Sequence, residues 1–157
     1  MQVESLAEAL EREHHEIDEG IETFAAGPVD RDRDPEPLTR AIQALRRHIY
    51  LEEEFLFPPL SATGLVAPIF VMLREHGQMW TTLDALEHDL DTGADAGSIL
   101  TQCRQLIVQL QHHNLKEEKI LYSQADQVLT APANTQLKGF LATGELPEGW
   151  VCHKAQS

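Results

Sequence analysis

Apolar residues recur at alternating steps of three and four along four long segments of the chain. This spacing places their side chains on one stripe of an α-helix, so the pattern predicts four amphipathic helices. The stripes comprise Leu6, Leu10, Ile17, Ile21 and Phe24 in the first segment; Leu38, Ile42, Leu45, Phe55 and Leu56 in the second; Ile69, Met72, Met79, Leu83, Leu86 and Leu90 in the third; and Ile99, Cys103, Leu106, Leu110, Ile120 and Val128 in the fourth.

Capping and helix-breaking residues set the ends of the first two segments. Ser5 followed by Glu8 forms a capping box that opens the first helix, and Gly27-Pro28 closes it before a polar loop that continues to Asp34. Asp34-Pro35 suits the N-cap and first position of the second helix, because proline at the first position loses no hydrogen bond. This helix is predicted to run to about Leu60.

Similar signals divide the second half of the chain. Pro68 lies in the opening turn of the third helix, which is predicted to end near Asp91. Gly93 to Gly97 forms a turn in which Asp95 caps the fourth helix, and that helix continues to about Leu129.

Four such helices joined by short turns bury their stripes most simply as an up-down-up-down bundle. The predicted fold is therefore all-α, with the four-helix bundle over residues 1–129. Residues 130–157 contain repeated proline and glycine, which interrupt helices. They are predicted to form a short C-terminal tail packed on or trailing from the bundle, with one extra short helix over 134–141 at most.

Six ionisable residues occupy positions on the apolar stripes: His14, His48, Glu52, His76, His113 and Glu117. Two His-x-x-x-Glu pairs are among them, and a spacing of four places both side chains of a pair on one helix face. All lie near the middle of their helices, so antiparallel packing brings them to one level. Burying two carboxylates together is costly unless a cation lies between them. Imidazole and carboxylate donors suit a first-row metal such as iron, manganese or zinc, and the carboxylates can bridge two ions.

The remaining histidines are predicted to lie outside the metal site. His15 and His88 share helix faces with acidic residues, and His153 lies in the tail. His112 is followed four residues later by Lys116 rather than a carboxylate, which favours its neighbour His113 as the ligand. Glu53, Glu54 and Glu118 are predicted to point outward or to support the ligands. One of them is the alternative if an assigned carboxylate is not a ligand.

Composition narrows the classes of function. The formal net charge of −14 disfavours binding to nucleic acids and anionic membranes. The two cysteines, Cys103 and Cys152, are too few for a disulfide framework. The chain lacks a basic N-terminal region followed by an apolar run, and it lacks an apolar stretch of about 20 residues. We therefore expect a cytoplasmic protein with no membrane and no nucleic-acid partner.

These motifs resemble the hemerythrin-like, HHE cation-binding family in its four-histidine variant. The resemblance spans about residues 5–127 and is carried by the segments 13–18, 48–58, 74–76 and 113–122, in the order His, His-x-x-x-Glu, His, His-x-x-x-Glu. It implies a non-haem, carboxylate-bridged site for two iron ions, with zinc or manganese as substitutes. By position, His14 and His48 would bind one iron, His76 and His113 the other, and Glu52 and Glu117 would bridge them.

One departure from the family pattern bears on function. Oxygen-carrying members have a fifth histidine one helical turn from the third-helix ligand, where this chain offers Met72 and Trp80. The resemblance therefore implies an extra coordination position for water, a small molecule or a further ligand such as Tyr122. This speaks against simple reversible oxygen carriage.

Three functions remain open on the sequence. The leading hypothesis is a di-iron protein that binds oxygen, nitric oxide or peroxide for sensing, scavenging or storage. The first alternative is a redox enzyme or iron donor that acts in peroxide turnover, ferrous oxidation or iron–sulfur cluster repair. The second is a structural metal site. No catalytic residue outside the metal site is indicated, which favours ligand binding over turnover.

Overall fold

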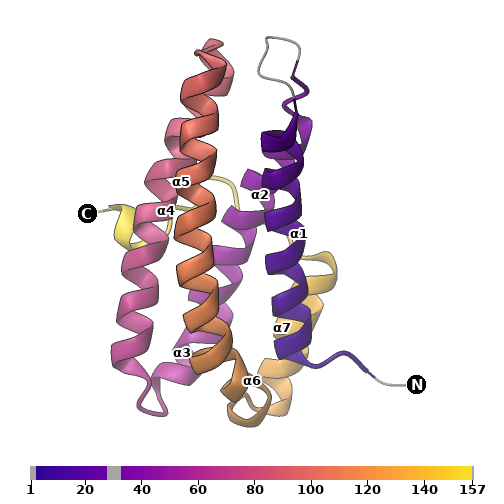
Figure 1. Ribbon diagram of the computed structural model, residues 1–157. Helices are drawn as coiled ribbons and strands as arrows, with labels where there is room; N and C mark the ends of the chain where they lie inside the picture. The colour runs from indigo at the N-terminus through magenta and orange to yellow at the C-terminus, as the bar shows by residue number, and fades with distance from the viewer. Residues whose placement is uncertain (1–2, 28–32, 157) are drawn as a thin grey trace.

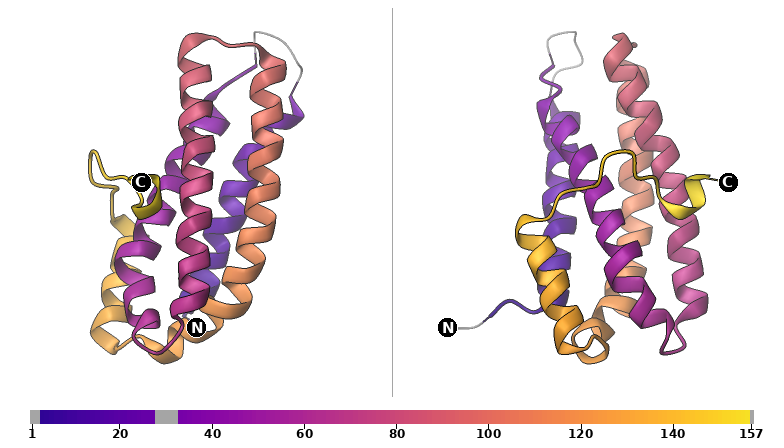
Figure 2. Two further views of the ribbon diagram at one scale, coloured as in Figure 1. Left: turned by 90° about the vertical axis from the view of Figure 1, so that its left-hand side faces the viewer. Right: turned by 180° about the vertical axis from the view of Figure 1, so that it is seen from behind.

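The computed structural model describes residues 3–27 and 33–156, and these residues form an all-α protein built on four long helices (Figure 1). The long helices are α1 (Leu6–Ala26), α2 (Glu36–Leu51), α4 (Val66–Thr92) and α5 (Ala96–Lys116). Successive long helices run in opposite directions (Figures 1 and 2). The predicted all-α, up-down-up-down bundle is confirmed. Pro28 and residues 29–32 of the predicted polar loop lie outside the described residues.

Two of the four predicted helices contain a π-helical turn in their C-terminal halves. Helix α2 continues through η1 (Glu52–Leu56) into α3 (Phe57–Ser61). Helix α5 continues in the same way through η2 (Glu117–Tyr122) into α6 (Ser123–Val128). In a π-helical turn the hydrogen bond joins residues five apart, which adds one residue to the turn.

The chain after the bundle forms one longer helix and one short one. Helix α7 (Ala131–Thr143) lies beside the lower halves of α1 and α2, and the 3-10 helix η3 (His153–Gln156) lies against α4 (Figure 2). Helix α7 extends beyond the predicted 134–141 at both ends. It starts earlier because Thr130, whose hydroxyl accepts the Ala133 N–H at 3.3 Å, caps it.

The helix starts follow the capping residues. Ser5 Oγ accepts the Glu8 N–H at 3.1 Å, and Glu8 Oε1 accepts the Ser5 N–H at 3.3 Å, as a capping box requires. Asp95 accepts the Ser98 N–H at the start of α5. Helix α2 begins one residue later than predicted, at Glu36, whose N–H donates to Asp34 Oδ1 at 3.0 Å.

The buried side chains form two apolar clusters, one on each side of a layer of ionisable residues. The upper cluster, near the ends of α1 and α4 at the top of Figure 1, includes Ile21, Phe24, Leu38, Leu83 and Leu100. The lower cluster includes Leu6, Leu10, Leu60, Leu121 and Ala125. Within 3–27 and 33–156, the structure contains no helix that is both long and apolar enough to cross a membrane.

One predicted core position is wrong. Ile120 is 40% exposed, whereas Leu121 and Tyr122 are each 1% exposed. The turn η2 begins at Glu117, and its extra residue rotates the following positions away from the 3.6-residue period. The inward face after Glu117 therefore falls on Leu121 and Tyr122 rather than on Ile120.

Candidate metal centre

The structure brings all six predicted ligands together in the middle of the bundle. Each is at most 3% exposed. The four histidines come from the four long helices, and the two carboxylates are the first residues of the two π-helical turns. The six residues, between the two apolar clusters, are His14, His48, Glu52, His76, His113 and Glu117.

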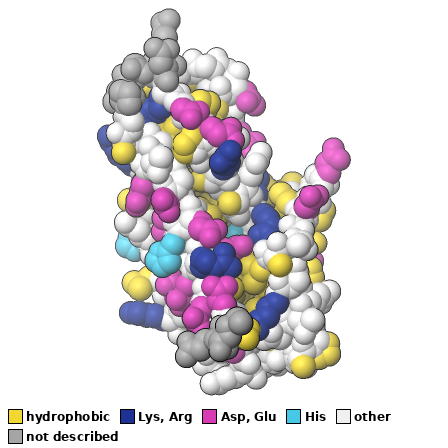
Figure 3. Space-filling view, turned by 90° about the vertical axis from the view of Figure 1, so that its right-hand side faces the viewer, with side chains coloured by type: hydrophobic (Ala, Val, Ile, Leu, Met, Phe, Trp, Pro, Cys, Tyr) yellow, Lys and Arg dark blue, Asp and Glu magenta, His cyan; other side chains and the backbone are white. Residues whose placement is uncertain are grey.

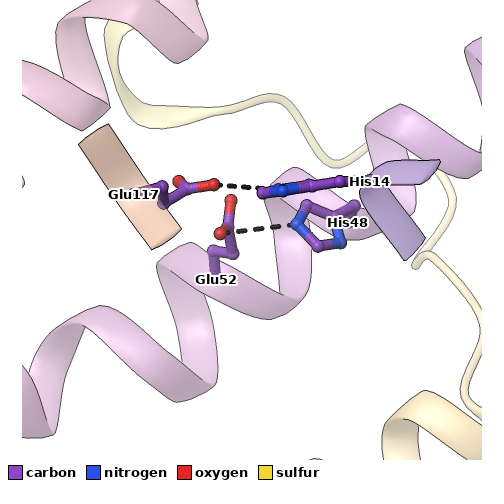
Figure 4. A group of neighbouring side chains, drawn as sticks. All are labelled: His14, His48, Glu52 and Glu117. Carbon is purple, nitrogen blue, oxygen red and sulfur yellow. Dashed lines mark hydrogen bonds and ion pairs between the residues drawn. The ribbon is translucent and has the colours of Figure 1, made fainter. Parts of the chain in front are cut away.

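These residues form two overlapping groups. The first group is His14, His48, Glu52 and Glu117, and the second is Glu52, His76, His113 and Glu117; within each group, one ligand atom per residue lies within 4.8 Å of the others. In Figure 4 the two histidines of the first group point toward the carboxylates of Glu52 and Glu117, which belong to both groups.

Each shared carboxylate presents a different oxygen to each group. Glu52 Oε2 lies 3.4 Å from His48 Nε2, and its Oε1 lies 3.2 Å from His76 Nε2. Glu117 Oε1 lies 3.1 Å from His14 Nε2, and its Oε2 lies 2.9 Å from His113 Nε2. This is the arrangement in which two carboxylates can bridge a pair of metal ions.

Two atoms in this layer show that a cation fits it. Glu52 Oε1 and His76 Nε2 are both buried and lie 3.2 Å apart, but neither makes a hydrogen bond. A buried polar atom without a partner destabilises the fold by about 1–3 kcal/mol, and more where it is charged. A metal ion held by both atoms would remove this cost, and imidazole nitrogen with carboxylate oxygen is a donor set that first-row metals accept.

Tyr122 reaches into the first group. Its Oη lies 2.6 Å from Glu52 Oε2, 2.9 Å from both His14 Nε2 and His48 Nε2, and 3.0 Å from Glu117 Oε1. Adjacent ligand atoms around an octahedral ion with bonds of about 2.1 Å are separated by about 3.0 Å. The phenol oxygen therefore stands where a fifth ligand would neighbour all four donors of the first group.

Each of the four histidines also donates the N–H of its second ring nitrogen to a carboxylate. The Nδ1 atoms lie within 2.7–2.9 Å of a carboxylate oxygen, in the pairs His14–Glu118, His48–Glu13, His76–Glu53 and His113–Glu75. A carboxylate at this position fixes the orientation of the ring and makes the opposite nitrogen a better ligand.

These four carboxylates close a ring around the bundle. Glu13 and Glu75 precede a ligand histidine of their own helix but bind the histidine of the next helix along the chain. Glu53 and Glu118 follow the shared carboxylates and bind His76 of α4 and His14 of α1. The pairs therefore join α1 to α2, η1 to α4, α4 to α5 and η2 back to α1.

Charge balance within the layer shifts the pKa values of its members. Burial alone would lower the pKa of His48, but the carboxylates of Glu52 and Glu13 outweigh burial and raise it to about 10. The pKa values of the other three histidines are raised in the same way. Burial alone would raise the pKa of Glu117, but His113, His14 and His76 hold it well below its usual range.

The pKa of Tyr122 is raised well above its usual value, first by burial and then by the negative charges of Glu117 and Glu52. In the metal-free protein these shifts favour imidazolium–carboxylate pairing beside a neutral phenol. A metal ion that binds here displaces protons from the histidines, and its own charge favours the phenolate.

The other histidines and acidic residues are also placed by the structure. His15, His88, His112 and His153 have exposed side chains, so His113 is the inward member of its pair. Glu54 is exposed, whereas Glu53 and Glu118 bind ligand histidines. Met72 belongs to the lower apolar cluster and Trp80 to the upper one.

Acidic side chains also gather along the middle of the face shown in Figure 3, with basic side chains among them.

Sequence reasoning did not assign a role to Glu13 or Glu75. Both stand immediately before a ligand histidine. The signal available in the sequence was an acidic neighbour beside His14, Glu52, His76 and Glu117 in turn, and that repetition distinguishes the supporting carboxylates from other surface acids.

Comparison with known proteins agrees with this geometry. Residues 5–125 match the model of the family described as "Hemerythrin HHE cation binding domain". This match covers most of the chain, and the protein belongs to the hemerythrin HHE cation-binding family. Neither the curated proteins nor the solved structures gave a match. The family and the buried His/Glu groups together define a non-haem, iron-binding class of protein.

Proposed function

We propose that the protein holds two iron ions in the two overlapping groups and binds oxygen, nitric oxide or peroxide there, for sensing, scavenging or storage. The observation that carries the proposal is that Glu52 and Glu117 each direct one oxygen to each group. An ion in each group would have one oxygen of each carboxylate beside it, whereas a single ion in one group would leave the oxygens that face the other group unused.

The surroundings of the two groups favour ligand binding at the second. Tyr122 supplies a fifth donor to the first group. The second group has four protein donors, so an octahedral ion there has room for an exogenous ligand. Bound iron would supply that open position and reversible one-electron chemistry.

The chain itself keeps the site dry and aligned. The ligand residues are at most 3% exposed and lie between the two apolar clusters, so bulk water is excluded. The four outer carboxylates orient the imidazoles, which keeps Nε2 of each directed toward the centre.

The test is to load the protein with ferrous iron under anaerobic conditions, measure iron per chain, and then add oxygen or nitric oxide. We expect about two irons per chain and new charge-transfer absorption in the visible. His14→Ala should lower the iron content, whereas His15→Ala, which changes the adjacent exposed histidine, should not. An iron-loaded protein that shows no spectral change with either gas would contradict the ligand-binding role.

A further inference from the structure

The chain beyond α7 follows a defined path to the metal centre. Residues 144–155, named here the C-terminal segment, cross the outer side of α2 and end against α4 (right-hand view of Figure 2). Trp150 packs against Tyr50 and Trp80, with ring centroids 5.1 and 5.6 Å apart, and Cys152 is 0% exposed within the upper apolar cluster. This segment lies outside the part of the chain that matches the family, residues 5–125.

Gly77 allows the segment to approach α4 beside a ligand. A Cβ atom at position 77 would lie 2.9 Å from Lys154 Cβ and 3.1 Å from the carbonyl carbon of Lys154. Contacts this short require one partner to move, and here one partner is backbone. The glycine next to His76 is therefore the position at which the C-terminal segment rests on the helix.

The segment contributes a backbone hydrogen bond to the outer carboxylate of His76. The His153 N–H donates to Glu53 Oε1 at 3.0 Å, and Glu53 Oε2 lies 2.7 Å from His76 Nδ1. Glu53 is 3% exposed, and each of its two oxygens accepts one of these hydrogen bonds. The His153 side chain is half exposed, and its Nδ1 lies 3.6 Å from Glu53 Oε1, which makes it the weaker contact.

Two of the other three outer carboxylates, Glu13 and Glu75, are held differently. Glu13 is paired with the Arg47 guanidinium at 2.9 Å, and Glu75 is paired with the ammonium of Lys116. Both partners are side chains of the bundle itself. Arg47 also donates to the carbonyl of Gly144, at the start of the C-terminal segment, at 2.9 Å. Glu53 differs because it accepts a hydrogen bond directly from the main chain of that segment, at the His153 N–H.

We propose that the C-terminal segment is a positioning element of the second metal group: the His153 N–H fixes Glu53, and Glu53 fixes His76. Docking of the segment thereby sets how tightly the ion between His76 and His113 is held. This inference rests on the proposed function, since it assumes that each group holds an ion.

The decisive comparison is His153→Pro against His153→Ala. Proline removes the N–H, whereas alanine removes the side chain and keeps the N–H. In fully loaded protein treated with a ferrous chelator, we expect one of the two ions to leave about 10–100-fold faster in His153→Pro. His153→Ala should release both ions as the wild type does. Equal release from the two variants, or wild-type release from His153→Pro, would overturn the proposal.

A second pair of variants tests the same contact from the other side. Gly77→Ala should push the segment away from α4 and reproduce the loss seen with His153→Pro. Gly139→Ala, at a helical position where an added Cβ meets nothing within 4 Å, is the matched control and should behave as the wild type. If Gly77→Ala retains both ions at the wild-type rate, the segment does not position the centre.

A metal-independent measurement separates this inference from the proposed function. In the metal-free protein, NMR of the His76 ring should show its Nδ1 proton exchanging with solvent faster in His153→Pro than in His153→Ala. An unchanged exchange rate contradicts the positioning role whatever the metal content. Fewer than two irons in the loaded wild type would contradict the proposed function, and the exchange measurement would still show whether the His153 N–H positions Glu53 and His76.

Discussion

At the scale of single residues, the centre is an arrangement of buried charges that neutralise one another in pairs. Glu52 and Glu117 are both 0% exposed, and two such carboxylates in one layer repel each other unless positive charge lies between them. Protonated histidines can supply that charge in the metal-free protein, and a bound metal would supply it in the loaded protein. The same ten side chains, counting the outer carboxylates, therefore serve both states.

Tyr122→Phe tests whether the phenol oxygen is a ligand. The oxidised, iron-loaded wild type should show a phenolate-to-iron charge-transfer band with resonance-enhanced ring vibrations, because Tyr122 Oη adjoins all four donors of the first group. We expect Tyr122→Phe to lose the band and keep measurable iron. Tyr50→Phe, which removes the hydroxyl of a tyrosine that packs against Trp150 rather than against the metal groups, should keep the band. A band that survives Tyr122→Phe would exclude the tyrosine as its source.

Cys103 gives a prediction about pH. Burial raises the pKa of its thiol to about 11, compared with about 8.5 in an unfolded chain. The folded state therefore favours the neutral thiol, and this contribution to stability is complete below pH ~8.5 and is lost as the pH rises toward 11. Denaturant unfolding at pH 8 and pH 10 should show a larger loss in the wild type than in Cys103→Ala, by at most about 2 kcal/mol. Equal losses would contradict it.

The residues that the sequence predicted differ in kind from those it did not. The six inward-facing residues interrupt an apolar period within their own helices, so one segment at a time is enough to find them. Glu13 and Glu75 bind histidines of other helices. Their roles depend on which helices pack together and on how those helices are aligned along the bundle axis. The spacing of residues within one helix determines neither the packing nor the alignment.

At the scale of elements, the two π-helical turns coincide with the two carboxylates that both metal groups share. Each begins at a shared carboxylate, Glu52 or Glu117, four residues after a ligand histidine. The histidine thus sits on regular helix, and the carboxylate starts the wider turn, which also brings Tyr122 inward five residues after Glu117. Such turns are frequent at functional sites. The sequence did not predict the second turn because Ile120, Leu121 and Tyr122 are consecutive apolar or aromatic residues, and their order alone does not show which of them face inward.

Alanine substitutions at Ile120 and Leu121 test the register that the turn η2 creates. Leu121 is 1% exposed, and Leu121→Ala should lower the free energy of unfolding by about 2–5 kcal/mol. Ile120 is 40% exposed, and Ile120→Ala should change it by less than about 1 kcal/mol. Denaturant unfolding of the two variants gives the comparison. The reverse order, with Ile120→Ala the more damaging, would mean that the helix continues with a regular α-helical period.

At the scale of the whole molecule, the layer of ionisable residues divides the core into the upper and lower apolar clusters. The upper cluster is built from uninterrupted stretches of the four long helices, with Trp150 and Val151 of the C-terminal segment packed on it. The lower cluster depends on α3 and α6, which have five and six residues. Helices this short are not stable alone and rely on packing. The sequence predicted the bundle from its period, but the path of the C-terminal segment has no such period and became visible only in three dimensions.

Removal of the metal should therefore affect the two halves unequally. A ligand that binds only the folded state stabilises it by RT ln(1 + [L]/Kd), about 4 kcal/mol at a free concentration a thousandfold above Kd. We expect the chelated protein to melt at a lower temperature and to regain the difference on reloading.

Amide hydrogen exchange would locate the segments that the bound metal stabilises. Chelation should raise amide exchange first in η1–α3 and η2–α6, because these segments connect the shared carboxylates Glu52 and Glu117 to the lower cluster. Amides of α1, α2, α4 and α5 near the upper cluster should change least, since their packing does not pass through the layer. A uniform rise across both clusters would show that the ions stabilise the bundle as one unit, and that the division of the core has no energetic consequence.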